Sequence, residues 1–133
     1  MFKFIVTAVF LVQFLACETN SAALNDECDS SPNQAILIRK GCEAYVFQLT
    51  KPSSLTQADW TDIFSKKPYQ NVLSVLNYCD DTPESKLLQS LNTGDQVTME
   101  LTSTQERCPN QCFAFEDAPG KGYKASKITV CLK

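Results

Sequence analysis

Residues 33–50 read NQAILIRKGCEAYVFQLT, and this stretch decides whether the N-terminal half of the protein is helical or β. Pro32 can begin a helix here and Pro52 can end it. Gly41 interrupts the run, and the aromatic residues after it also alternate as on a strand. The length of the run and its start and stop signals favour a helix. The residues of its apolar face recur at helical three-four spacing: Ala35, Ile38, Cys42, Tyr45 and Leu49.

Three more helices are predicted after this one, over residues 54–66, 72–79 and 82–91. The first carries an apolar stripe around Trp60, the only tryptophan of the chain, which we interpret as a core residue. The last has the clearest start, because Thr82 can cap the helix and Pro83 suits its first turn. Gly94 can adopt the left-handed backbone conformation that commonly ends a helix.

The pattern changes to period two after Gly94. Apolar and polar residues alternate over 97–101, which is typical of a half-buried strand, and 123–132 is predicted as a second strand after the turn cluster 119–122. The predicted fold class is therefore α+β, with N-terminal helices followed by a C-terminal antiparallel β-sheet or hairpin.

The first 23 residues have the three parts of a secretory signal peptide. A positive start at Lys3 precedes a short apolar run, and small residues follow, with cleavage expected after Ala23. The apolar run is too short for a transmembrane helix, and the alternative of a lipoprotein acylated at Cys17 is disfavoured by Phe14. We expect a secreted, extracellular protein whose residues 24–133 form one disulfide-rich domain without a membrane span.

The mature segment contains an even number of cysteines, which in a small secreted domain predicts three disulfides rather than a zinc site. One pair can be argued from strand register. A hairpin that turns on residues 121–122 places Phe113 opposite Val130 and Cys112 opposite Cys131, so this bond is favoured. The six cysteines are Cys28, Cys42, Cys79, Cys108, Cys112 and Cys131.

Composition excludes several classes of function. The chain has no histidine, so it cannot use a Ser-His-Asp triad or a histidine metal ligand, and its net charge of −3 does not suit nucleic-acid binding. Asp59 and Asp62 are expected on one solvated face of a helix, where they cannot lie on opposite sides of a substrate. The acids near Glu84 are expected in the first turn of a helix, where they stabilise the helix start and need no ligand. We therefore expect no enzyme, no cofactor and no metal. The carboxylates considered were Asp59, Asp62, Asp80, Asp81, Glu84, Glu100 and Glu116.

The last thirteen residues carry four lysines and no acid. Lys121, Lys124 and Lys127, beside Pro119, are the predicted binding residues, because a basic tip could attract an acidic partner. The alternative is a charged edge strand that resists aggregation.

The tail is similar to the last hairpin of secreted cystatins, which inhibit papain-like proteases. The similar residues are Cys112, Phe113, Phe115, Pro119, Gly122 and Cys131. The resemblance implies that this hairpin would enter a protease. The chain departs from it at Gly120, where the cystatin hairpin has tryptophan, and in the spacing of Gln89 and Gly94, the segment compared with the central loop.

The sequence leads us to expect a monomeric, non-enzymatic binding or effector protein of the salivary, venom or defence type, which docks on an extracellular protein partner. Two alternatives stay open. One is a cystatin-like protease inhibitor, and the other is a carrier of a small apolar ligand held near Trp60.

Overall fold

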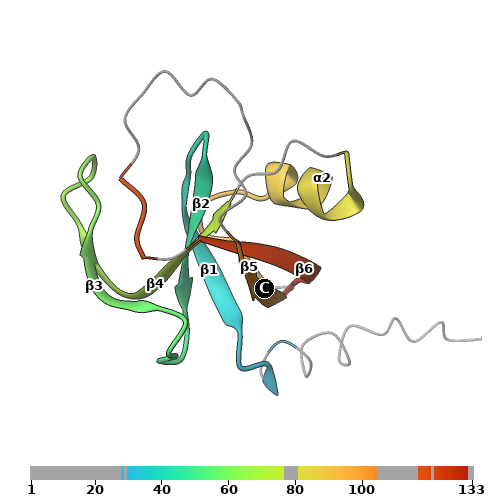
Figure 1. The fold of residues 1–133 in the computed structure, drawn as a ribbon, viewed down its shortest axis with the longest axis horizontal. Coiled ribbons are helices and arrows are strands. Elements are labelled where there is room, and N and C mark those ends of the chain that lie inside the picture. The colour runs from blue at the N-terminus through green and yellow to red at the C-terminus, as the bar shows by residue number, and fades with distance from the viewer. Residues whose placement is uncertain (1–27, 29, 77–80, 105–116, 121, 132–133) are drawn as a thin grey trace, which may run out of the picture.

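The computed structural model describes residues 28, 30–76, 81–104, 117–120 and 122–131, which form a β-barrel with a helix beside it (Figure 1). The helix α2 (Pro83–Ser90) lies between the fourth and fifth strands in the chain. The strands are β1 (Gln34–Lys40), β2 (Ala44–Leu49), β3 (Gln57–Thr61), β4 (Pro68–Leu76), β5 (Gln96–Ser103) and β6 (Gly122–Val130).

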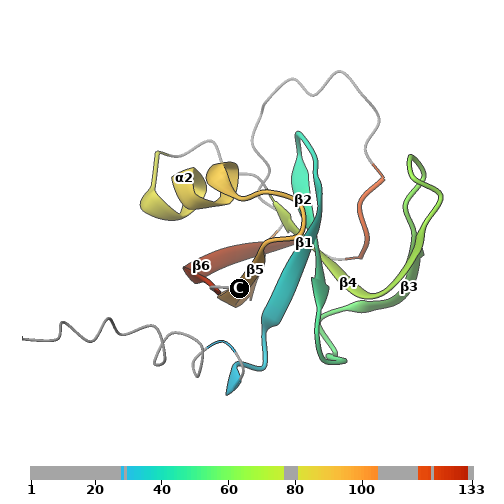
Figure 2. The ribbon, with the colours of Figure 1, turned by 180° about the vertical axis from the view of Figure 1, so that it is seen from behind.

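Five of the strands close into a barrel in the order β2-β1-β5-β6-β4, and β4 pairs back to β2. All neighbours are antiparallel except β4 and β6, which run parallel over the pairs Ser74 with Gly122 and Val75 with Tyr123. The remaining strand, β3, pairs with the first half of β4. It lies on the side of the barrel away from α2 (Figure 2).

The interior of the barrel is filled by apolar side chains from every barrel strand. Phe47, Leu37 and Leu73 are completely buried there, and Leu88 and Leu91 of the α2 segment pack against the same core. A second cluster lies on the outer face of the sheet, where Trp60 packs with Val46, Val72 and their neighbours. Strands β2 and β4 are therefore covered on both faces near this second cluster.

The predicted α+β fold class with N-terminal helices is wrong, because the described chain is mostly β and residues 33–50 form the antiparallel pair β1 and β2. Tyr45, Phe47 and Leu49 face the interior, and Val46 faces the outer cluster. A strand that is buried on both faces has a continuous apolar run, and periodicity cannot distinguish such a run from a buried helix. Gly41 lies in the turn between the strands, where its N–H donates to the carbonyl of Ala44 at 2.9 Å.

The predicted helices at 54–66 and 72–79 are also wrong. The first region contains β3 and the turn that follows it, and the second belongs to β4 as far as Leu76. The helix predicted over 54–66 does not form past residue 61 either, because the Asp62 carboxylate accepts hydrogen bonds from the N–H groups of Phe64 and Ser65 and so closes a turn.

The predicted helix at 82–91 and strand at 97–101 are confirmed as α2 and β5, and the strand predicted from residue 123 is confirmed as β6 as far as Val130. Thr82 is the N-cap of α2, and its hydroxyl accepts a hydrogen bond from the N–H of Ser85 at 3.3 Å. Strand β6 pairs with β5, from Val130 opposite Val97 to Tyr123 opposite Ser103. Local signals were sufficient for these three elements.

The favoured bond between Cys112 and Cys131 is wrong, because Cys131 is bonded to Cys28, with 103 residues of sequence separation. Cys42 is also disulfide-bonded. Cys79, Cys108 and Cys112 lie outside the described residues, as does the segment 112–116 on which the hairpin register was argued. Among the described strands, β6 takes its antiparallel partner from β5.

In the part of the chain that the structure describes, no helix has both the length and the hydropathy needed to cross a bilayer.

Candidate functional site

The candidate site is the hairpin formed by β3 and β4, which extends from the side of the barrel opposite α2 (Figures 1 and 2). Trp60 and Tyr69 are cross-strand partners on this hairpin, and their ring centroids lie 6.0 Å apart with an interplanar angle of 30°. Trp60 is buried against the outer face of the barrel and Tyr69 is half-buried. The aromatic pair therefore lies near the turn of the hairpin, and Trp60 packs this part of the hairpin against Val46 of the barrel.

Arg39 is the centre of the contacts that hold the hairpin. The register between β1 and β2 shifts at this point, since Leu37 pairs with Phe47 but Arg39 pairs with Val46. The extra residue is a β-bulge, and it turns Arg39 to the outer face instead of the interior face of Leu37. The guanidinium carbon then lies 5.1 Å from the ring centroid of Trp60, within the range of a cation–π contact.

The guanidinium of Arg39 also joins two segments that are distant in sequence. It donates to Oδ1 of Asp62 at 2.7 Å and to the backbone carbonyl of Asp117. The indole N–H of Trp60 donates to the carboxylate of Asp117 at 3.2 Å. The hairpin is thus tied to the segment that precedes β6 as well as to β1.

Asp62 fixes the turn at the end of β3. Its carboxylate is only 10 % exposed and accepts from Arg39 and from the N–H groups of Phe64 and Ser65. Burial by itself would raise its pKa, but the hydrogen bonds from Ser65, Arg39 and Phe64 outweigh burial and lower the pKa from 3.8 to about 2. The carboxylate is therefore ionised at neutral pH and holds the turn.

Phe64 projects from this turn into solvent. Its side chain is 64 % exposed, although one face of the ring lies under the guanidinium of Arg39 at 5.5 Å. Among the described residues it is the exposed large apolar side chain. Ser65, Lys66 and Lys67 follow it and are exposed. We call residues 62–67 the hairpin turn.

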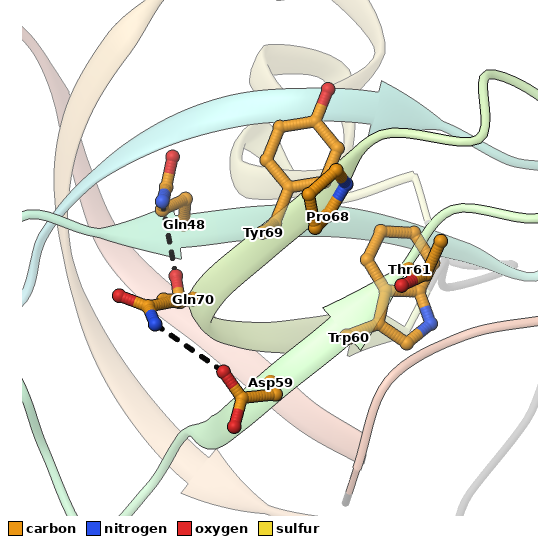
Figure 3. Close-up of a pocket in the computed structure, with 7 residues that line it drawn as sticks. All are labelled: Gln48, Asp59, Trp60, Thr61, Pro68, Tyr69 and Gln70. Carbon is orange, nitrogen blue, oxygen red and sulfur yellow. Dashed lines mark hydrogen bonds between the residues drawn. The ribbon is translucent and has the colours of Figure 1, made fainter.

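A pocket of about 390 Å³ lies on the hairpin next to this turn (Figure 3). Its polar side is ordered by two hydrogen bonds. The Gln48 amide donates to the backbone carbonyl of Gln70 at 3.0 Å, and the Gln70 amide donates to the Asp59 carboxylate at 3.3 Å. The lining residues described are Gln48, Asp59, Trp60, Thr61, Pro68, Tyr69 and Gln70.

Of the predicted binding residues, the structure describes Pro119, Lys124 and Lys127. Pro119 is completely buried, and its carbonyl accepts from the hydroxyl of Ser74 at 2.7 Å. Lys124 and Lys127 are exposed on β6, where Lys127 pairs with Glu100 at 2.7 Å. Lys121 lies outside the described residues.

The described carboxylates among the catalytic candidates are distributed over β3, the hairpin turn, the start of α2 and β5. Asp59 lies on β3 and Asp62 in the hairpin turn, so the predicted shared helix face does not exist. Glu84 lies in the first turn of α2, and Asp81 pairs with Lys86 at 3.0 Å. Asp80 and Glu116 lie outside the described residues. In the described part of the chain, no three acidic or thiol side chains gather as a metal site requires.

Sequence reasoning missed Arg39 and Phe64, the two residues that define the hairpin site. Phe64 followed by Ser65-Lys66-Lys67 was a usable signal, because an aromatic residue in a polar, basic stretch is typical of a turn. Arg39 carried no such signal, since its position on the outer face depends on the bulge.

Comparisons with protein-family models, with curated proteins and with solved structures find no match to this chain.

Proposed function

We propose that this chain is a secreted, non-enzymatic binding protein that docks on an extracellular protein partner through the hairpin turn. The observation that carries the proposal is the ordered exposure of Phe64. A single exposed apolar residue is ordinary on a protein surface. Phe64 differs because Arg39 covers one face of its ring and Asp62 fixes its backbone. A side chain that is ordered before binding loses less entropy when it enters a partner.

The charges beside Phe64 indicate an acidic partner. Lys66 and Lys67 are exposed, and the ion pairs of the described residues involve neither of them. Two positive charges beside an aromatic anchor attract an acidic surface and raise the rate of association. The proposed partner site is therefore an apolar pocket with an acidic rim, which receives Phe64 in its centre.

Secretion is part of the proposal and is supported by two features. The first 23 residues have the pattern of a signal peptide. The Cys28–Cys131 disulfide is compatible with an oxidising compartment.

The two alternative functions receive less support. A carrier of an apolar ligand held near Trp60 needs an apolar pocket there, whereas Trp60 is buried and the pocket beside it is lined by polar side chains as well, such as Gln48 and Asp59. An inhibitor that uses the loop at Pro119 as its wedge needs that residue exposed, and Pro119 is buried. The hairpin turn is the more accessible projection.

The test compares partner capture by the wild-type protein and by Phe64→Ala. The immobilised proteins are exposed to extracellular fluid of the source organism, and a protein retained by the wild type is purified and its affinity measured. We expect Phe64→Ala to weaken that affinity by about 30-fold, as truncation of a central anchor costs about 2 kcal/mol or more.

Charge reversal tests the second part of the proposal. Lys66→Glu with Lys67→Glu is expected to slow association at low salt and to leave dissociation nearly unchanged. Lys127→Ala is the control, since Lys127 is exposed on β6, away from the hairpin. If Phe64→Ala binds the partner as tightly as the wild type, the hairpin turn is not the docking site.

A further inference from the structure

We propose that the pocket on the hairpin binds a neutral, polyhydroxylated ring, which is the chemistry of a sugar residue. This inference does not depend on docking by the hairpin turn, because the two sites use different side chains. The pocket is built from β2, β3 and β4 (Figure 3).

The apolar side of the pocket suits the face of a sugar ring. Tyr69 is half-buried, and the exposed ring of Pro68 extends the apolar surface beside it, while Trp60 lies buried beneath the pocket. The face of an aromatic ring carries partial negative charge, which attracts the weakly positive C–H groups of a sugar face. The aromatic pair with Trp60 holds the Tyr69 ring in position.

The polar side of the pocket offers donors and acceptors for hydroxyl groups. Each glutamine uses one amide hydrogen within the pocket, so a second amide hydrogen and the carbonyl oxygen of Gln48 and Gln70 are left for a ligand. The second oxygen of the Asp59 carboxylate is an additional acceptor. Sugar hydroxyls both donate and accept, and therefore match a row of amides and a carboxylate.

The charge of the pocket disfavours anions. Among the described lining residues, Asp59 is the charged one, and it is negative. An anionic ligand would meet repulsion from this carboxylate without a cation in the pocket to compensate.

An organic cation is also disfavoured. Recognition of such a ligand typically uses a cage of aromatic faces. Here the guanidinium of Arg39 already lies 5.1 Å from the Trp60 ring centroid, which leaves Tyr69 as the accessible ring. The single carboxylate, Asp59, is exposed to solvent and already accepts from Gln70. A solvated carboxylate attracts a cation weakly.

The size of the pocket fits one or two sugar rings. Its volume of about 390 Å³ lies near the lower end of the range for small-molecule sites, which is roughly 300–1,000 Å³.

Trp60 provides the readout, because it lines the pocket and is the only tryptophan of the chain. The purified full-length secreted protein is titrated with glucose, galactose, mannose and N-acetylglucosamine, and separately with tetramethylammonium chloride, while tryptophan emission is recorded. We expect a saturable change with at least one sugar at millimolar concentration and none with the cation. Two-dimensional amide spectra of the same titration locate the change.

Two variants test the pocket, and a third is the control. Tyr69→Ala is expected to weaken sugar binding by about ten-fold or more, as loss of the stacking face removes about 1.4 kcal/mol. Asp59→Ala removes an exposed acceptor and is expected to weaken binding several-fold without loss of thermal stability. Phe64→Ala is expected to bind the sugar as the wild type does, because Phe64 does not line the pocket.

The outcomes separate this inference from the docking proposal. Sugar binding that survives Phe64→Ala but is lost in Asp59→Ala supports the pocket even if no protein partner is found. The inference is overturned if no sugar gives a saturable change, if tetramethylammonium binds in place of the sugars, or if Asp59→Ala and Tyr69→Ala both bind as tightly as the wild type.

Discussion

Replacement of Asp62 by asparagine is expected to lower the free energy of unfolding by about 2 kcal/mol at pH 7. The carboxylate has a pKa of about 2 in the folded protein and an ordinary value of 3.8. At 1.36 kcal/mol for each pKa unit, this difference stabilises the ionised folded state by about 2 kcal/mol at pH 7. Asparagine keeps the shape of the side chain and an oxygen that can accept from Ser65, but it cannot compensate the charge of Arg39.

The dependence on pH has a definite sign. Because the pKa of Asp62 is lower in the folded state, its contribution is complete above pH 3.8 and is lost as the pH falls towards 2. We expect the stability difference between wild type and Asp62→Asn to fall from about 2 kcal/mol at pH 7 to about 0.4 kcal/mol at pH 2. Urea unfolding, followed by tryptophan emission with the disulfides intact, measures this difference at each pH.

The matched control is Asp59→Asn, which changes an exposed carboxylate on the same hairpin. It is expected to change stability by about 0.5 kcal/mol or less. If Asp62→Asn is as stable as the wild type at pH 7, or if the difference between them is the same at pH 2 and pH 7, the carboxylate does not stabilise the turn through its charge.

Three further substitutions test the barrel itself. Cys28→Ser with Cys131→Ser opens a loop closed over 103 residues and is expected to cost about 2–5 kcal/mol in chemical unfolding. Gly122→Ala places a Cβ 2.8 Å from buried Leu76 at the parallel junction, and we expect a loss of about 1–3 kcal/mol with a lower melting temperature. Thr82→Ala removes the N-cap hydroxyl of α2 and is expected to cost about 1 kcal/mol, with faster amide exchange in the first turn. A loss below 0.3 kcal/mol in any of the three would show that the interaction concerned does not stabilise the fold.

The elements that were predictable from the sequence are those with local signals. Thr82 and Pro83 mark the start of α2, and the alternation around Met99 marks β5 without reference to the rest of the chain. The elements that were mistaken depend on distant contacts. Val46 is buried because Trp60 covers it, so the outer face of β2 carries an apolar residue in the middle of the strand and the alternation typical of a half-buried strand is weakened.

The candidate site was less predictable than the fold. The sequence at Phe64 and the lysines after it predicts an exposed turn. The fixed position of the Phe64 ring, however, depends on its contact with Arg39, which lies 25 positions earlier. The position of Arg39 depends in turn on the bulge between β1 and β2, and a bulge shows only when the register of both strands is known. The disulfide partner of Cys131 could likewise not be predicted from the spacing of the cysteines in the sequence, because Cys28 is brought next to Cys131 only by the folding of the chain.

The Cys28–Cys131 bond has a consequence for proteolysis. It makes the chain between these residues a covalent ring, so that a single cut after Lys66, which is exposed, opens the ring without releasing a fragment. The two pieces would remain one molecule on a non-reducing gel and separate only after reduction. Strands β3 and β4 would still be paired on either side of the cut. Such a protein can be nicked at its most exposed projection and still keep its barrel.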